Sequence, residues 1–330
     1  MQRYNNWMWY TYDDLPPNHP KPRPDSVLNL HFDKSYNLLD INYFEALRRN
    51  ALLLQEIYGG PFDVMLSGGI DSEVIVRMNH MLGIKQNVYT FRFENDINFY
   101  DVYSALTICN DLGIKLNLID FNVQKFFENE AEHYYKISYP SVVEKLVRFK
   151  FYEYMDHIPV AGDGEPYWVR DEWNNFDVKS TWSMLFWEFD YAHATYSRAV
   201  NRTVIGEWYQ FTPEIWTSFI KLPKVVSLLN DDISGRLSSW SYRTELHQTL
   251  WPTIRRKPKL VGYEGLHSKP WRPEYMTEFQ KTYMPKESAF RFTVQDMQNL
   301  FNKDYDLIIK DDEYFKKFDD IHNKYQQTIR

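Results

Sequence analysis

The stretch DVMLSGGIDSEVIV, residues Asp63 to Val76, is the part of the chain that decides the fold. Its first residues, Asp63–Leu66, form a short apolar run typical of a buried parallel strand, whereas Ile70–Met81 has helical spacing. Between them, Ser67–Gly69 are small enough for backbone amides to crowd together, and the helix that follows directs its own unpaired amides at the same place. The sequence therefore predicts a strand, an anion-binding turn and a helix.

Composition limits the class of protein. The chain has 330 residues and a hydrophobic content of 44%, enough for one large domain or two ordinary ones with a sizeable core. The single cysteine, Cys109, excludes an internal disulfide, a two-cysteine sulfur relay and a four-cysteine zinc site. No apolar run approaches the ~20 residues that span a bilayer, and the N-terminus lacks a hydrophobic signal core. We expect a soluble cytoplasmic protein with no membrane partner.

The charge and the aromatic content favour small substrates. A formal net charge of −7 argues against nucleic acid as a partner, because nonspecific affinity for it comes mainly from Lys and Arg that neutralise phosphates. Aromatic residues make up 18% of the chain, and core and interface packing explains them better than a base-stacking platform does. The nine histidines show no metal-ligand spacing, so the sequence assigns them no role.

The order of the elements predicts an α/β fold: a parallel sheet with helices on both faces. Strands are expected near residues 64, 89 and 117, with helices at 42–57, 70–81 and 99–112. Such βαβ crossovers are right-handed. Helices at about 123–136 and 140–155 lead to a fourth strand, 157–161, and directly to the turn Gly162–Glu165. Because ligands bind beyond the carboxyl ends of such strands, the two glycine turns are expected to face each other.

Three regions follow from this pattern. Residues 1–41 contain a proline cluster and are expected to form an extended N-terminal arm on the body, residues 42–176 the α/β domain, and residues 177–330 a mostly helical substrate-side region packed on it. The segment 251–265 is the one concentrated basic patch, and taken alone such a patch is typical of a solvated surface.

The glycine turn differs from a Walker A loop because it has no lysine and carries Asp71, where Mg²⁺ could bridge to phosphate oxygens. Ser67–Ser72, SGGIDS, resembles the signature of the N-type ATP pyrophosphatase (PP-loop) family. The resemblance implies an adenine nucleotide alpha hydrolase-like fold. It also implies that the loop holds the departing pyrophosphate of ATP while a substrate oxygen attacks the α-phosphate. An ordinary Gly-Gly turn is the alternative.

Later motifs resemble the synthetase domain of asparagine synthetase and its relative β-lactam synthetase, over roughly residues 43 to 265. Ala161–Glu165 is similar to that family's second glycine turn, G-E-G-x-D-E. Phe211–Trp216 lies where the family has R-V-P-F-L-D, and Leu250–Lys257 is similar to L-P-x-x-I-x-x-R-x-K. The first motif is specific, whereas these three are loose and gain weight from their order.

The chain also departs from that family. Gln2 follows Met1 and only about 60 residues precede the loop, so we expect no N-terminal glutaminase domain. The metal-binding Asp of the second turn is replaced by Pro166, so Glu165 or Asp171 would have to supply that carboxylate. The segment Phe211–Trp216 keeps neither the Arg nor the Asp of its counterpart, which leaves the carboxylate substrate open.

The resemblance implies a set of site residues. Those that would bind ATP are Leu66, Ser67, Gly68, Gly69, Asp71, Ser72, Phe91 and Gly162, with Leu66 and Phe91 contacting adenine mostly through backbone. Asp71 and Glu165 would hold Mg²⁺. Asp163 would help deprotonate the attacking amine, and Lys257 would stabilise negative charge as the acyl-adenylate breaks down, with Arg256 as the alternative residue for that role.

The predicted function is an ATP-dependent ligase that adenylates a carboxylate and passes the acyl group to ammonia or another amine, releasing AMP and pyrophosphate. The partners would be a small-molecule carboxylate and an amine or ammonia, with a separate glutaminase as one source of the ammonia. Two alternatives stay open: a PP-loop enzyme that adenylates a carbonyl of a nucleotide or tRNA base, and a non-catalytic ATP-binding protein.

Overall fold

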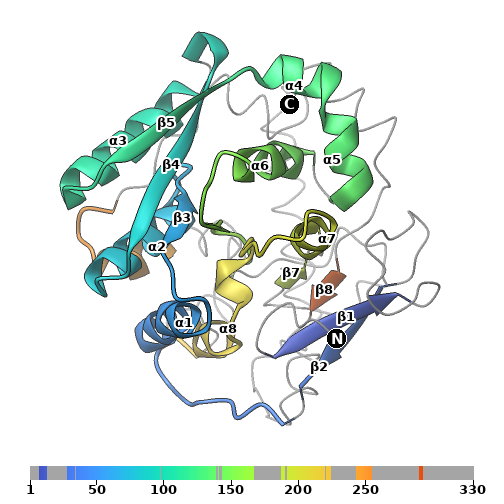
Figure 1. The fold of residues 1–330 in the computed structure, drawn as a ribbon. Helices are drawn as coiled ribbons and strands as arrows, with labels where there is room; N and C mark the ends of the chain where they lie inside the picture. The colour runs from blue at the N-terminus through green and yellow to red at the C-terminus, as the bar shows by residue number, and fades with distance from the viewer. Residues whose placement is uncertain are drawn as a thin grey trace, which may run out of the picture.

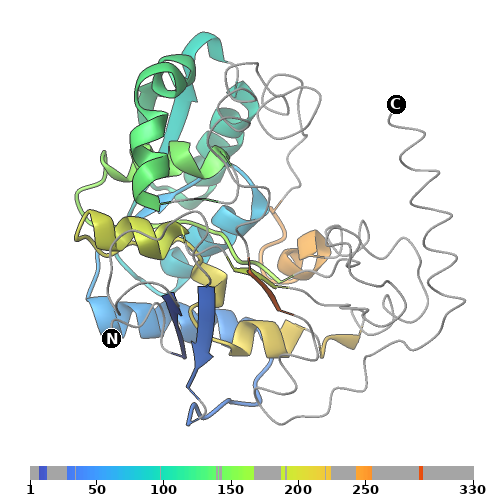
Figure 2. The same cartoon turned by 90° about the vertical axis from the view of Figure 1, so that its right-hand side faces the viewer.

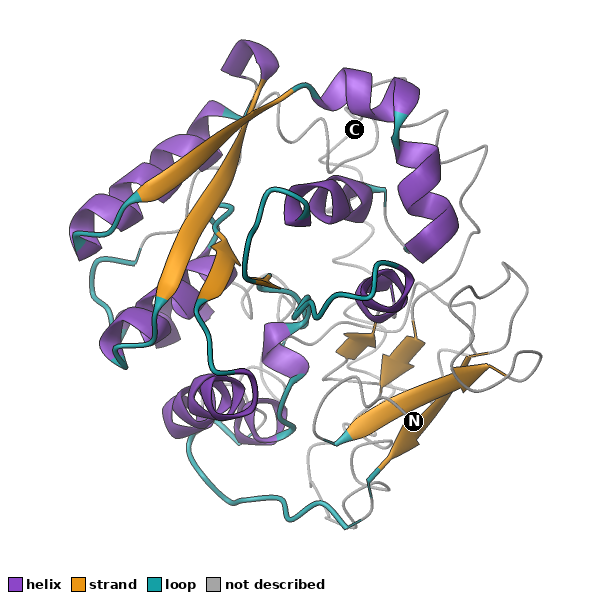
Figure 3. Ribbon diagram, in the orientation of Figure 1, coloured by secondary structure: helices purple, strands orange, loops and turns teal. Residues whose placement is uncertain are grey.

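The structure is a computed structural model of the chain. It describes residues 7–12, 28–33, 35–96, 98–138, 140, 143–166, 187–189, 192–219, 221–223, 243–254 and 290–292. Figure 1 shows these residues coloured along the chain, and Figure 3 colours them by secondary structure.

Within the described residues, the central sheet has four parallel strands in the order β5-β4-β3-β6. The strands are β3 (Phe62–Met65), β4 (Gln86–Phe93), β5 (Leu116–Phe121) and β6 (Ile158–Val160). In register, Val64 lies opposite Val88 on one side and Val160 on the other. β3, which precedes the glycine turn, is thus an interior strand, and the predicted parallel α/β sheet is confirmed.

Helices cover both faces of this sheet (Figure 1). Helices α2 (Ile70–Met81) and α3 (Phe99–Leu112) carry the chain from β3 to β4 and from β4 to β5, in one direction across the sheet. Helices α4 (Val123–Asn129), α5 (Ala131–Ser138) and α6 (Glu144–Tyr152) carry it back past β3 to β6. Right-handed crossovers place the two groups on opposite faces. The direction reverses at β3, so the turns after β3 and β6 border the crevice where such sheets bind ligands.

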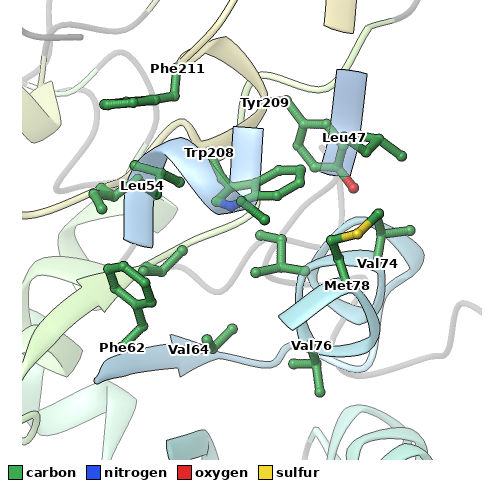
Figure 4. Packing of buried hydrophobic residues seen from close by; sticks show 14 of the residues in the cluster. Leu47, Leu54, Phe62, Val64, Val74, Val76, Met78, Trp208, Tyr209 and Phe211 are labelled. Atoms are coloured by element: carbon green, nitrogen blue, oxygen red, sulfur yellow. The ribbon is translucent and has the colours of Figure 1, made fainter. Parts of the chain in front are cut away.

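The main hydrophobic core joins β3 and α2 to α1 (Tyr43–Tyr58) and to the segment 208–211. Figure 4 shows side chains from these elements pointing into one cluster. Trp208 is 1% exposed, and its carbonyl accepts a hydrogen bond from Asn50 Nδ2 of α1 at 3.0 Å. The core therefore fixes the segment after residue 207 against the strand and the helix that flank the glycine turn.

The helix boundaries follow the local signals. α1 begins after Asn42, whose side chain accepts from Glu45 N, and ends at Gly59 in the left-handed region, φ 77°. α2 and α3 have the predicted bounds. The single helix predicted at 123–136 is instead two helices, because the backbone leaves the helical region at Glu130, φ −125°. Among the described residues, no helix combines the length and apolar character needed to cross a membrane.

Two antiparallel strand pairs outside the central sheet were not predicted from the sequence. Where an extended arm was expected, β1 (Met8–Tyr12) pairs antiparallel with β2 (Leu28–Phe32), as Figure 2 shows from the side. Trp7, next to β1, is buried and donates from Nε1 to the Gln210 carbonyl at 3.0 Å. The described part of the second half contains the helices α7 (Ala192–Ala199) and α8 (Glu214–Phe219). It also contains an antiparallel pair, β7 (Trp187–Phe189) with β8 (Phe290–Phe292).

Candidate functional site

The turn between β3 and α2 has the geometry of an anion cradle. Gly68 adopts φ 69°, and a Cβ atom there would lie 2.6 Å from the Asp101 carbonyl oxygen, so only glycine fits without strain. Gly69 is the N-cap of α2 and is extended, and as a glycine it makes no side-chain cap to the helix. These amides have no partner within the helix. The start of α2 therefore offers donors and a positive dipole end to an anion.

The serines of the loop hold its shape. Ser67 N donates to Ser72 Oγ at 3.2 Å, and the two hydroxyl oxygens lie 3.1 Å apart. Ser72 Oγ also lies 3.1 Å from the Gly69 carbonyl, to which it can donate. These bonds cross from one end of the turn to the other, so the loop residues predicted from SGGIDS are brought together as one compact element.

The second glycine turn lies directly against the first. A Cβ atom on Gly162 would be 3.0 Å from Ser72 N and 3.1 Å from Asp71 C, so the backbone at Gly162 approaches the start of α2 very closely. The segment 205–207 supports this turn, because Ala161 N donates to the Ile205 carbonyl at 2.8 Å and Asp163 N to the Gly206 carbonyl at 3.2 Å. The expectation that the two turns face each other is confirmed.

A buried arginine that the sequence analysis did not single out joins the two turns. Arg243 Nη1 lies 3.0 Å from Asp71 Oδ1 and 3.5 Å from Glu165 Oε1. Arg243 is 5% exposed, and its Nε atom is buried with no hydrogen-bond partner among the described residues. Burial, followed by the neighbouring Asp71 carboxylate, raises the pKa of Glu165 to about 7. Burial also raises the pKa of Asp71, against the opposing charge of Arg243.

Besides the two carboxylates, Tyr209 and His247 lie near this arginine. The Tyr209 hydroxyl donates to the Asp71 backbone carbonyl at 2.9 Å, and Tyr209 is fully buried. His247 lies one helical turn after Arg243, in the helical residues 243–248, and its ring stacks on Tyr43 with centroids 5.9 Å apart. Burial, followed by the nearby Arg243 charge, lowers the pKa of His247 to about 3. His247 is therefore neutral in the folded protein at ordinary pH.

This neutral histidine predicts a pH dependence of stability. As the pH falls below 6.5, the unfolded chain binds a proton at His247 while the folded chain does not, so stability is lost from pH 6.5 down to about 3. Between pH 6.5 and 5.5 this contributes a loss of about 1 kcal/mol. In urea unfolding, the free energy of unfolding of His247→Gln is expected to fall between pH 6.5 and 5.5 by about 1 kcal/mol less than that of the wild type. Parallel losses in both proteins would contradict the assignment.

Asp163 is part of a charged cluster built by α6. Arg148 Nη1 forms an ion pair with Asp163 Oδ2. Lys145 Nζ lies 3.9 Å from Asp163 Oδ2 and also 3.9 Å from Glu207 Oε1. Behind Lys145, Glu207 Oε1 lies 2.6 Å from Nδ1 of His193, and both side chains are buried. Burial raises the pKa of Glu207 and lowers that of His193. The predicted base on the second turn is therefore already paired with cations.

The other predicted residues lie elsewhere. Leu66 is fully buried and its N–H donates to the Tyr89 carbonyl at 2.8 Å. Phe91 stacks on Phe121 with centroids 4.2 Å apart, and its carbonyl accepts from Asn98 Nδ2 at 2.9 Å. Both belong to the core, so adenine contact at these positions stays a prediction. Three further residues named from the sequence, Asp171, Arg256 and Lys257, lie outside the described residues.

The described residues do not fit a magnesium ion between Asp71 and Glu165. Mg²⁺ is bound through oxygen ligands at short, near-ideal distances. Here the two carboxylates share the guanidinium of Arg243, so a metal between them would have to replace it. The part of the chain that the structure describes contains no group of three or more His, Cys, Asp or Glu side chains placed to hold a metal ion. The described residues therefore give no support to the predicted magnesium site at Asp71 and Glu165.

Sequence reasoning missed the residues that complete this site. They are Lys145, Arg148, His193, Glu207, Tyr209 and Arg243. Lys145 and Arg148 stand three apart on the helix before the second turn, a spacing that places them on one face, and this was the one available signal. Arg243 follows Asp71 by 172 residues, and no motif surrounds it.

A scan of protein-family models and a search of curated proteins give no match to this chain. Among solved structures, it is similar to the NMN synthetase from Francisella tularensis, with 17% identity and a TM-score of 0.29 over 38% of this chain. The match spans 56% of that synthetase. A second similar structure is the NH3-dependent NAD synthetase from Campylobacter jejuni in complex with the nitrate ion, with 11% identity and a TM-score of 0.28. That match covers 82% of this chain and 100% of the other. At TM-scores below 0.5, neither likeness adds to what the sheet and the two turns show.

Proposed function

We propose that this chain is an ATP-dependent ligase of the PP-loop kind, with an adenine nucleotide alpha hydrolase-like fold. It would adenylate a carboxylate and transfer the acyl group to ammonia or another amine, releasing AMP and pyrophosphate. The observation that carries the proposal is the SGGIDS turn between an interior parallel strand and α2, packed against a second glycine turn where the sheet reverses direction.

The loop would bind the pyrophosphate part of ATP. Hydrogen bonds of Ser67 and Ser72 fix the shape of the loop, and the first amides of α2 have no partner within the helix, so they can donate to a phosphate. Such preorganised donors stabilise charge that develops on a departing group. ATP would enter as its magnesium salt, and magnesium supplies charge neutralisation on the phosphates.

The second turn would serve the acyl acceptor. Asp163 lies on the turn that packs against Ser72, so a base there stands next to the phosphate cradle. Its pairing with Arg148 and Lys145 means that it must exchange partners before it accepts a proton from an amine. Small molecules are the proposed partners: the carboxylate and an amine or ammonia, with a separate glutaminase as a source of ammonia. The proposed compartment is the cytoplasm.

Release of pyrophosphate tests this proposal. The purified protein is incubated with ATP, Mg²⁺, ammonia and a panel of amino acids and other carboxylic acids, and pyrophosphate is measured by a coupled assay. At least one acid is expected to raise the release above the acid-free control, with one AMP formed for each pyrophosphate. Absence of acid-dependent release across the panel would count against a ligase.

A non-catalytic ATP-binding protein is the second candidate, because Arg243 and the two cations of α6 already engage the acids of the site, and Pro166 stands where a carboxylate is expected. A binding measurement by calorimetry, combined with an assay for AMP and pyrophosphate, separates the two candidates. A non-catalytic protein would bind ATP with measurable affinity, and neither AMP nor pyrophosphate would accumulate with any acid.

A further inference from the structure

We propose that Arg243 is a built-in cation of the phosphate site: it takes the position between Asp71 and Glu165 that a divalent metal would occupy, and it binds the pyrophosphate group directly. This inference rests on the proposed role of the Ser67–Ser72 loop in binding phosphates. It makes pyrophosphate binding by the protein independent of a resident metal ion.

The contacts show that one cation serves two carboxylates. A single atom, Arg243 Nη1, is within ion-pair distance of both Asp71 Oδ1 and Glu165 Oε1. Asp71 belongs to the first turn of α2, whose amides form the cradle, and Glu165 belongs to the second glycine turn. The guanidinium is thereby fixed between the two turns that border the crevice. A metal ion bridging these acids would hold the same place.

Burial makes the guanidinium hard to displace. Arg243 is 5% exposed, and arginine does not lose its proton in proteins. Moving it aside for a metal would leave a buried charge without its carboxylate partners, which is strongly unfavourable. Two groups near it, Tyr209 and His247, are also buried, and the pKa of His247 lies far below neutral pH, so neither supplies a positive charge that could replace it.

A donor of Arg243 remains to be satisfied. Its Nε–H is buried and has no acceptor among the described residues, although native proteins pair almost all such donors. Guanidinium groups bind phosphate oxygens through several donors held in one plane. A phosphate oxygen at the cradle would satisfy this donor while Nη1 keeps its carboxylates. The ligand class that fits is a pyrophosphate or polyphosphate anion.

Binding of inorganic pyrophosphate without metal tests the inference. In buffer containing EDTA, calorimetry is expected to detect pyrophosphate binding to the wild-type chain and a loss of at least about tenfold in affinity for Arg243→Met, since a charge-assisted contact is removed. Arg243→Lys keeps the charge and loses the planar fork, so it is expected to fall between the two. Binding by the wild type only when Mg²⁺ is added would overturn the inference.

A gain of metal binding gives the second readout. Removing the guanidinium leaves Asp71 and Glu165 without their cation, so Arg243→Met is expected to bind Mn²⁺, seen as loss of the free Mn²⁺ signal in electron paramagnetic resonance, whereas the wild type alone does not. The added change Asp71→Asn should abolish the gain. Arg148→Met is the matched control: it also removes an arginine from a carboxylate of the second turn, but Asp163 keeps Lys145.

Equal Mn²⁺ binding by the wild type and Arg243→Met would show that the acids already accept a metal and would overturn the inference. Circular dichroism confirms that the variants are folded, and Arg243→Lys provides the comparison if Arg243→Met is not. These are binding measurements, so failure to find a carboxylate substrate would contradict the proposed function and leave them unchanged.

Discussion

Asp71→Asn is expected to lower ATP–pyrophosphate exchange on the order of 100-fold, because it removes a carboxylate that fixes charge at the phosphate site. Asparagine keeps the size of the side chain and is acceptable in the first turn of α2, but it cannot form the 3.0 Å ion pair with Arg243 Nη1. The guanidinium then keeps only the longer contact to Glu165. Activity and folding should therefore separate.

The measurement pairs an exchange assay with a thermal melt, run with the acid that supports pyrophosphate release. The midpoint of Asp71→Asn is expected to fall by several degrees because buried Arg243 loses its nearer carboxylate, but the protein should stay folded because Glu165, 3.5 Å away, still pairs with the guanidinium. Asp111→Asn makes the same chemical change at a half-exposed acid 3.8 Å from Arg77 and should leave exchange unaltered. Near-normal exchange in folded Asp71→Asn would remove the catalytic role of the loop acid.

Gly206→Ala is expected to destabilise the protein by about 3 kcal/mol, because the new methyl group has no room and its neighbour cannot move away. A Cβ atom on Gly206 would lie 2.1 Å from Cγ of His193 and 2.3 Å from its Nδ1. The His193 ring is fully buried, packs edge-on against Phe149 with centroids 5.3 Å apart, and holds Glu207. Relief of the clash would break that contact or shift α7.

Chemical denaturation of Gly206→Ala, His193→Ala and the double variant checks this prediction. Removing the ring makes space for the methyl group, so the double variant should be more stable than the sum of the two single losses implies, by about 1 kcal/mol or more. An unfolding midpoint for Gly206→Ala equal to that of the wild type would show that the segment 205–207 does not pack on α7 as described. If the losses of stability in Gly206→Ala and His193→Ala simply add in the double variant, the new methyl group does not clash with the His193 ring.

The predicted parts of the site lie where a short stretch of sequence dictates its own structure. The bounds of α2 and α3, the buried position of β3 and the left-handed turn at Gly68 all follow from spacing, small residues and caps. The second turn was located by its glycines and by the rule that ligands bind where a parallel sheet reverses direction. Its closeness to Ser72 was a consequence of topology, which the order of elements was sufficient to predict.

Short and isolated elements were harder to predict. The pair β7 and β8 has only three residues in each strand, too few for an alternating pattern to appear, and its strands lie far apart in the chain. The break at Glu130 splits a continuous helical pattern, so periodicity could not reveal it. Likewise, Trp7 is one of several aromatic residues near the N-terminus, and its hydrogen bond to the Gln210 carbonyl joins positions too far apart in the chain for a local pattern to predict.

By itself, the sequence determined the sheet, the two facing turns and the identity of the loop residues, because local backbone preferences and hydrophobic periodicity act over neighbouring positions. Tertiary structure alone decided what those residues touch. Arg243 meets Asp71 across 172 positions, and Lys145 stands between Asp163 and Glu207, through packing that no local pattern records. The core that surrounds these charged side chains sets their positions. Burial of Trp208 and Tyr209 against β3 and α2 brings the segment that follows residue 204 beside the loop. The electrostatics of the site follow from that packing.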